Sequence, residues 1–217
     1  MNRPLLITDC DEVLLHMVRH MSAWLDEAHA IDFWPHAGMF AKAARRRECG
    51  TVIDDAEMWT LLDGFFAEEM ARQTLVPHAG AALERIAEQA DIVILTNLGE
   101  HCLPGRIEQL AAHGIRHRVI CNGTNSKGAP VAELVAEYRP SAAVFVDDMP
   151  LHHASVARHA PDVFRLHMIA EPRIAGEVAP APAAHVRIDD WADAVGWIID
   201  RFEGRPLPAE TQTETHA

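Results

Sequence analysis

A short apolar run near the beginning of the chain, LLIT (5–8), is followed by two acidic residues one position apart, Asp9 and Asp11. An apolar run too short for a helix is typical of a buried strand. Residues i and i+2 of an extended chain point the same way, so both carboxylates are expected close together at the carboxyl end of that strand. Like charges held that close resist joint ionisation. The pair therefore predicts a functional site, because a purely structural strand has little reason to accept the repulsion.

Similar apolar runs recur along the chain and alternate with helical patterns. The helical patterns place apolar residues at i, i+3, i+4 and i+7, over residues 131–138 and 195–202. Near-continuous Val and Ile runs are typical of strands covered on both faces. The alternation predicts an α/β fold with a doubly wound, Rossmann-like parallel sheet. The predicted strands are LLIT (5–8), IVILT (92–96), RVIC (118–121), AVFVD (143–147), VFRL (163–166) and HVRI (185–188).

One long interval interrupts this alternation. Between the first strand and the helix that begins near Ala79, helical stripes are predicted at 17–28 and 58–65, separated by an irregular segment, 31–50. We interpret residues 16–75 as a small α-helical cap above the carboxyl edge of the sheet. Residues 1–15 and 76–203 then form the α/β core, and the polar end, 204–217, is predicted to be a disordered tail.

The composition narrows the classes of partner. The 217 residues carry a formal net charge of −13, which argues against nucleic acid, because its backbone attracts basic surfaces. No apolar run approaches the length of a membrane span, no basic leader precedes an apolar segment, and the four cysteines lack metal-binding spacing. We expect a cytoplasmic protein that binds neither membranes nor nucleic acid. The oligomeric state is left open, a homodimer included.

Polar residues also follow three other predicted strands, at the edge where ligands bind in such sheets. Thr96 and Asn97 end the second strand, Lys127 lies in the loop after the third, and Asp147 and Asp148 end the fourth. Each of these has a plainer explanation when taken singly. The Thr-Asn pair is typical of a turn or a helix cap, and the lysine is typical of a solvated loop. Two aspartates shortly before a proline are typical of the start of a helix. Their joint occurrence with the acid pair on one rim predicts a single polar site.

The ordered motifs DCDEV (9–13), ILTN (94–97), SKG (126–128) and VFVDD (144–148) resemble the four motifs of the haloacid dehalogenase-like (HAD) superfamily. The long insertion directly after the first motif resembles the type 1 cap of that superfamily. Members with a second aspartate in the first motif are phosphatases and phosphotransferases, whereas the dehalogenases lack it. Asp11 therefore implies phosphate chemistry.

The resemblance implies a role for each residue. Asp9 would attack phosphorus and form an aspartyl-phosphate, while Asp11 would protonate the leaving alkoxide and then activate water. Thr96 and Asn97 would hold oxygens of the transferring group, and Lys127 would stabilise its growing charge.

Magnesium is the cofactor that these residues imply. At ~4 Å and an effective dielectric constant of ~20, each pair of unit negative charges costs about 4 kcal/mol, so an attacking carboxylate needs compensation. Asp9, the backbone carbonyl of Asp11, Asp147 and Asp148 offer the hard oxygens that suit Mg²⁺. Asp148 would bind directly and Asp147 through water or by orienting its neighbour, although the sequence leaves the order of these two open.

Three positions bear on how far the family pattern holds. Glu12 stands where glycine is common, and a side chain there narrows the turn conformations open to the backbone. His152 stands where many relatives carry a further aspartate. Cys10, between the two acids, is expected to be buried and to point away from the pocket.

Two further patterns have plainer explanations. His16 and His20 have the i, i+4 spacing of a metal pair, but no third ligand is evident nearby. The run Arg45-Arg46-Arg47 could recruit an anionic substrate, although a solvated face is favoured.

The sequence favours a Mg²⁺-dependent phosphomonoester hydrolase acting on a small, soluble, phosphorylated metabolite. Selectivity is expected from residues 31–50 of the cap, with Trp34, His36, Lys42 and the arginines as candidates. The alternatives are a phosphotransferase or mutase, a phosphonate-cleaving enzyme that uses Lys42, and a non-catalytic sensor that binds a phosphate ligand. Sugar phosphates, phosphoglycolate and nucleotide monophosphates all stay open as substrates.

Overall fold

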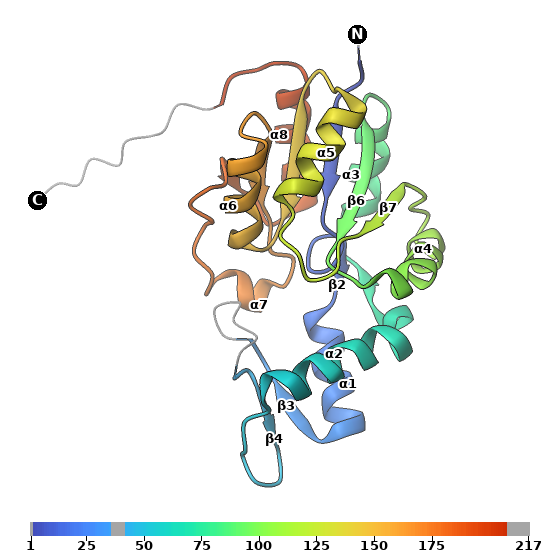
Figure 1. The fold of residues 1–217 in the computed structure, drawn as a ribbon, viewed down its shortest axis with the longest axis vertical. Helices are drawn as coiled ribbons and strands as arrows, with labels where there is room; N and C mark the ends of the chain where they lie inside the picture. The colour runs from blue at the N-terminus through green and yellow to red at the C-terminus, as the bar shows by residue number, and fades with distance from the viewer. Residues whose placement is uncertain (1, 36–41, 208–217) are drawn as a thin grey trace, which may run out of the picture.

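The computed structural model describes residues 2–35 and 42–207, and within these residues six strands form one parallel sheet (Figure 1). The strand order is β10-β9-β8-β1-β6-β7, which confirms the predicted α/β fold with a doubly wound sheet. Three strands differ slightly from their predicted bounds: the second in the chain begins one residue earlier, the fifth is shifted by one residue and the sixth is shorter. The strands are β1 (Leu5–Thr8), β6 (Asp91–Thr96), β7 (Arg118–Cys121), β8 (Ala143–Asp147), β9 (Phe164–His167) and β10 (Val186–Arg187).

Alternate residues of the central strands pack against opposite layers of helices, as a pleated strand requires. Leu6 and Val144 belong to the core beneath α3 (Ala79–Ala87) and α8 (Trp191–Phe202). Leu5 and Phe145 belong to the core beneath α5 (Gly128–Tyr138) and α6 (Pro150–His159). Both faces of the sheet are therefore covered by helices and shielded from solvent, which explains the continuous apolar runs in the sequence. The remaining helices of this part are η3 (Glu100–Cys102), α4 (Leu103–Ala112) and α7 (Pro172–Ala175).

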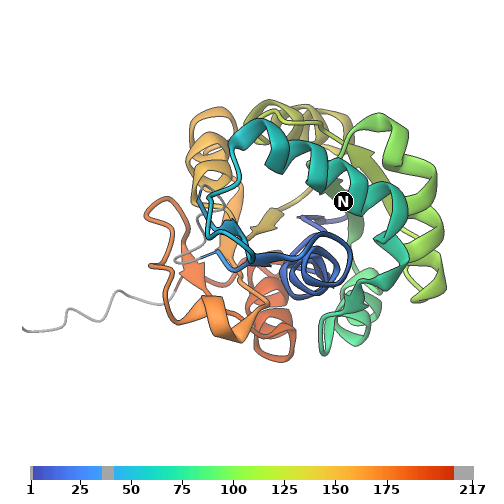
Figure 2. The same cartoon turned by 90° about the horizontal axis from the view of Figure 1, so that it is seen from below.

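The segment after β1 forms a separate layer at one end of the molecule, beyond the carboxyl edge of the sheet (Figures 1 and 2). Met21, Leu25 and Phe65 are buried in a hydrophobic cluster that also takes in Leu98 and Ile169 from the part of the chain that forms the sheet. The segment expected to be irregular contains a two-stranded antiparallel ribbon, because Ile31 and Phe33 face this core while Asp32 between them is exposed. The elements are α1 (Val18–His29), β3 (Ile31–Phe33), β4 (Ala44–Arg46), α2 (Asp55–Glu68) and η2 (Met70–Arg72).

The two chain crossings between this layer and the sheet lie side by side. β2 (Leu15–His16) and β5 (Thr74–Leu75) pair in antiparallel fashion, with His16 opposite Thr74. Residues 208–217 of the predicted tail and His36 of the predicted cap lie outside the described residues. The domain bounds inferred from the sequence stay predictions. None of the described helices is long and apolar enough to cross a membrane.

Candidate active site

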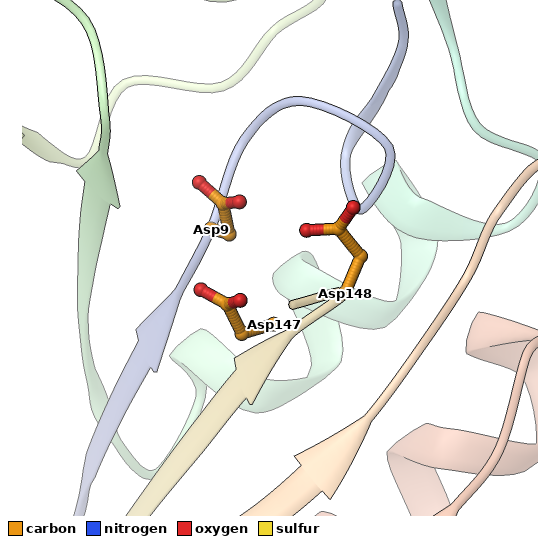
Figure 3. A group of neighbouring side chains, drawn as sticks. All are labelled: Asp9, Asp147 and Asp148. Carbon is orange, nitrogen blue, oxygen red and sulfur yellow. The ribbon is translucent and has the colours of Figure 1, made fainter. Parts of the chain in front are cut away.

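Three carboxylates meet where β1 and β8 end side by side. Asp9 follows β1 directly, Asp147 is the last residue of β8, and Asp148 follows it. Figure 3 shows the three side chains gathered above the ends of the two strands, and each offers an oxygen within 4.8 Å of the others. β1 lies between β6 and β8, so the chain leaves this edge in opposite directions from neighbouring strands. Such switch points are where doubly wound sheets bind ligands.

Lys127 lies within this group and is fully buried, so it is not the solvated loop lysine of the plainer interpretation. Its Nζ is 2.7 Å from Asp9 Oδ1 and 2.8 Å from Asp147 Oδ2. Burial alone would lower the pKa of Lys127, but Asp147 and Asp9 raise it above its ordinary value. Lys127 is a fixed cation between two of the three carboxylates.

Gly128, the residue after Lys127, allows the close helix packing that brings the lysine to the three carboxylates. A Cβ at Gly128 would lie 2.4 Å from Ser155 Oγ and 2.5 Å from the Ser155 carbonyl oxygen. Only glycine lets the first turn of α5 pack this closely against α6. The SKG motif therefore combines a charged residue with the backbone contact that holds it.

The charges of the three acids are not balanced within the group. Burial tends to raise the pKa of Asp147, but Lys127 beside it lowers the pKa below the usual value. Burial raises the pKa of Asp9 to about 7 and, with Asp147 and Asp9 nearby, raises the pKa of Asp148 well above its usual value. Three carboxylates face one ammonium group. A divalent cation would supply the missing charge, and an all-oxygen donor set suits a hard ion. The residues therefore fit a metal.

Two buried histidines, which the sequence reasoning missed, hold the backbone behind these acids. His153 Nε2 lies 3.0 Å from the Asp147 carbonyl oxygen, and His167 Nε2 lies 2.9 Å from that of Asp148. His167 Nδ1 accepts a hydrogen bond from the Ala181 N–H, so its proton is on Nε2 and donates to Asp148. Nothing in the sequence distinguishes these two among fourteen histidines.

Asp11 has partners of its own, on the other side of the loop. Arg106 Nη2 lies 2.9 Å from both carboxylate oxygens, Gln73 Nε2 donates at 2.7 Å, and Thr96 Oγ1 donates at 3.4 Å. Asp11 raises the pKa of Asp9, as the expected repulsion requires, but burial and Asp147 raise it more. Each acid also has a cation beside it, Lys127 for Asp9 and Arg106 for Asp11. Sequence reasoning missed Arg106 and Gln73, which lie on a helix and a linker outside the four motifs.

The residues expected to hold phosphate are placed differently from one another. Thr96 Oγ1 donates to Asp11, while Asn97 lines the cavity above the acids and its Nδ2 donates to the Asn125 carbonyl at 2.8 Å. Asn97 Oδ1 is buried and has no hydrogen-bond partner among the described residues. Lys127 contacts the two aspartates. The structure thus brings these three residues to one edge of the sheet, and their roles toward phosphate stay predictions.

Glu12 has a left-handed backbone conformation, which glycine adopts more easily than other residues. Its φ is +57°, and its buried Oε1 accepts hydrogen bonds from the N–H groups of Met17 at 2.7 Å and Val18 at 2.6 Å. These bonds cap the start of α1, whose own N-cap residue provides no side-chain cap. Burial raises the pKa of Glu12 to about 7. Glu12 therefore links the site loop directly to the first cap helix, although its backbone conformation is strained.

The other singled-out residues have structural explanations. Cys10 is buried, with its Sγ 3.2 Å from Arg106 Nη1. His20 Nε2 lies 2.9 Å from Thr74 Oγ1, and Arg46 and Arg47 form ion pairs on the cap surface. Within residues 2–35 and 42–207, the three aspartates are the one group of three or more ligating side chains that could hold a metal.

The acids open into a cavity of about 760 Å³ between the sheet and the cap. Asp9, Asp11, Asp148 and His152 line it, whereas Asp147 is fully buried behind them. This cavity is large enough for a small organic ligand. The arrangement can therefore bring a ligand to the carboxylates that line the cavity, while Asp147 and Lys127 support them from beneath.

Comparison with known proteins gives agreement in structure only. No family model and no curated protein matches the sequence. A HAD hydrolase of Bacillus subtilis, solved with magnesium bound, gives a TM-score of 0.62 at 12% identity, over 91% of this chain and 99% of that chain. A haloacid dehalogenase-like hydrolase of Streptococcus pneumoniae gives 0.61 at 9% identity, over 89% and 97%. A Lactobacillus plantarum chain provisionally described as a phosphoglycolate phosphatase gives 0.57 at 16% identity, over 90% and 99%. The TM-scores show a shared fold, and identities this low show nothing beyond the fold. It is the fold that the motifs predicted.

Proposed function

We propose that this chain, which has the fold of the haloacid dehalogenase-like hydrolases, is a Mg²⁺-dependent phosphomonoester hydrolase. The observation that carries the proposal is the position of Asp9 at the base of the cavity, beside Lys127 and the Asp147–Asp148 pair. A carboxylate placed there can act as a nucleophile with positive charge close at hand. The substrate is a small phosphorylated metabolite.

The reaction follows two steps. An oxygen of Asp9 attacks phosphorus, the bond from phosphorus to the ester oxygen breaks, and Asp11 gives its proton to the departing alcohol. Asp11 then takes a proton from water as that water attacks the aspartyl-phosphate, which releases inorganic phosphate and restores the Asp9 carboxylate. Lys127 stays bound to Asp9 and stabilises the negative charge that grows during both attacks.

Asp9, Asp148 and the backbone carbonyl of Asp11 would hold the magnesium ion, with Asp147 orienting its neighbours. The ion would add positive charge where the carboxylate and the phosphate repel each other. The unbalanced charge of the three aspartates supports its presence, and the magnesium bound to the Bacillus subtilis neighbour is consistent with it. His153 and His167 would keep both strand-end carbonyls in place.

The test is release of inorganic phosphate from a panel of phosphomonoesters with Mg²⁺. We expect turnover by the wild type and by the control Asp193→Asn, an exposed position on α8, and none by Asp9→Asn. Equal, feeble activity of the wild type and Asp9→Asn, with phosphate-ester binding retained, would support a non-catalytic sensor instead.

A phosphotransferase or mutase is the second candidate. A Thermotoga maritima chain with this fold, provisionally described as a β-phosphoglucomutase, gives a TM-score of 0.56 at 12% identity. Phosphate appearing on an added sugar or alcohol, faster than it appears in solution, would favour this reading over hydrolysis.

A further inference from the structure

The walls of the cavity above the catalytic acids are apolar. On the cap side, the apolar lining includes Ile53 and four residues of α2: Met58, Trp59, Leu62 and Phe66. Their spacing puts one side of α2 toward the cavity. Beyond Asp55 at its start, this side of α2 is apolar. Ile53 and Phe66 are buried and Met58 and Leu62 pack against the same hydrophobic cluster, whereas Trp59 keeps 56% of its surface exposed.

The opposite wall, on the sheet side, is apolar as well. It includes Leu98, Met149, Leu151, Ile169 and Ile174. Leu151, at the start of α6, keeps 52% of its surface exposed. Two of the large hydrophobic side chains that the described part of the chain exposes therefore border this one cavity. Exposed apolar surface gathered around a cavity indicates a ligand that covers it.

Polar groups are scarce once the catalytic acids and Asn97 are set aside. Among the described lining residues, Lys42, Asp55, Thr124 and His152 carry the other polar side chains, apart from the capping Glu12, and no arginine is present. A sugar or nucleoside has several hydroxyl or ring groups that need partners when buried. Each group left unpaired costs about fivefold to a hundredfold in affinity. The cavity is poorly suited to such leaving groups.

We infer that the physiological substrate is the phosphate ester of an apolar alcohol, held with its phosphoryl group at Asp9 and its hydrocarbon part between α2 and the α6 side of the cavity. This inference rests on the proposed function and narrows it. It disfavours the sugar phosphates, phosphoglycolate and nucleotides that the sequence left open. The volume of about 760 Å³ leaves room for a hydrocarbon chain in addition to the phosphoryl group.

The first test is a substrate series. We expect kcat/KM with Mg²⁺ to rise from butyl to decyl phosphate by up to about fourfold for each added methylene, until the cavity is full. The longest ester should exceed glucose 6-phosphate, phosphoglycolate and AMP by at least about tenfold. A flat series, or a preference for any of the three polar esters, would overturn the inference.

Variants on the two walls connect the series to this cavity. Trp59→Ser and Leu151→Asn should each flatten the dependence on chain length, and because both side chains are largely exposed, both variants should fold. The matched control is Ile107→Asn on α4, where the isoleucine is 48% exposed but does not line the cavity, and it should leave the series unchanged. An unchanged slope in both wall variants would place the preference elsewhere and contradict the inference.

Failure of the proposed function can be separated from failure of this inference. If neither acetyl phosphate nor any monoester is hydrolysed, the hydrolase proposal fails. Calorimetric titration of the Mg²⁺-loaded wild type with methyl- to octylphosphonate, which cannot be hydrolysed at the carbon–phosphorus bond, then decides the inference. Affinity that rises with chain length supports an apolar site, and affinity that is independent of chain length overturns it.

Discussion

Arg106 Nη2 lies 2.9 Å from both carboxylate oxygens of Asp11, and this contact joins α4 to the loop that follows β1. The Arg106 side chain is fully buried, and its guanidinium also lies 5.6 Å from the ring centre of Phe66 on the cap helix α2. Gln73, just before β5 on the linker that leaves the cap, binds the same carboxylate. Asp11 is therefore held from the core and from the linker at once.

Removing Arg106 should destabilise the protein mainly through Asp11. We expect Arg106→Leu to cost about 3 kcal/mol of unfolding free energy, because a buried charge loses its partner. In an Asp11→Asn background the same change should cost about 1–2 kcal/mol less. Urea unfolding of the four proteins of this cycle measures the coupling. Arg118→Leu, which breaks the exposed pair with Glu137, should cost less than about 1 kcal/mol. Equal costs of Arg106→Leu in both backgrounds would show that the contact does not stabilise the fold.

The proposed acid role of Asp11 should depend on the leaving group. Asp11→Asn should lower the hydrolysis of alkyl phosphates by about 10²–10⁴-fold, because the departing alkoxide no longer receives a proton. Acetyl phosphate, whose leaving carboxylate needs no proton, should still phosphorylate Asp9. The phosphoenzyme should then accumulate, since the second step also needs Asp11. Acid-quenched protein-bound phosphate measures this directly. Full-rate hydrolysis of alkyl phosphates by Asp11→Asn would rule out the acid role.

Much of the fold and one part of the site could be predicted from the sequence, for a physical reason. Buried parallel strands require continuous apolar runs, and ligands meet the strand ends, so Asp9, Asp147 and Asp148 are visible as acids that end such runs. The ribbon of β3 and β4 was missed because three-residue strands leave almost no periodic signal.

The supporting residues could not be predicted in the same way. Arg106 lies on α4 and Gln73 on a linker, and each reaches Asp11 only through the tertiary fold. The partners of the Asp147 and Asp148 carbonyls are set by how α6 and β9 pack, which no local pattern records. Glu12 shows the converse, because the departure from glycine was visible while its use as a cap for α1 was not.

The histidine behind Asp148 should affect metal binding without touching the metal. His167→Phe removes the hydrogen bond to the Asp148 carbonyl, so the acid is held less firmly. We expect the Mg²⁺ concentration that gives half of the thermal stabilisation to rise about tenfold, in the range found for residues that support metal ligands. Asp148→Asn should abolish the Mg²⁺-dependent rise in melting temperature. The control His113→Phe, at an exposed position after α4, should leave the titration unchanged, and a change equal to that of His167→Phe would remove the argument.

Acid should destabilise the protein partly through His16, which is buried on the linker strand β2. Burial, assisted by Arg19, lowers the pKa of His16 to about 4, so the folded protein keeps it neutral where the unfolded chain protonates it. Because the unfolded state binds more protons between about pH 6.5 and pH 4, the unfolding free energy falls as the pH falls through this range. One such histidine contributes at most about 1.4 kcal/mol per pH unit. His16→Gln should reduce the slope of unfolding free energy against pH by up to that amount, while the control His113→Gln, at an exposed position, should not. Urea unfolding at several pH values measures this slope. Identical slopes for the wild type and His16→Gln would mean that His16 takes up its proton in the folded protein as readily as in the unfolded chain.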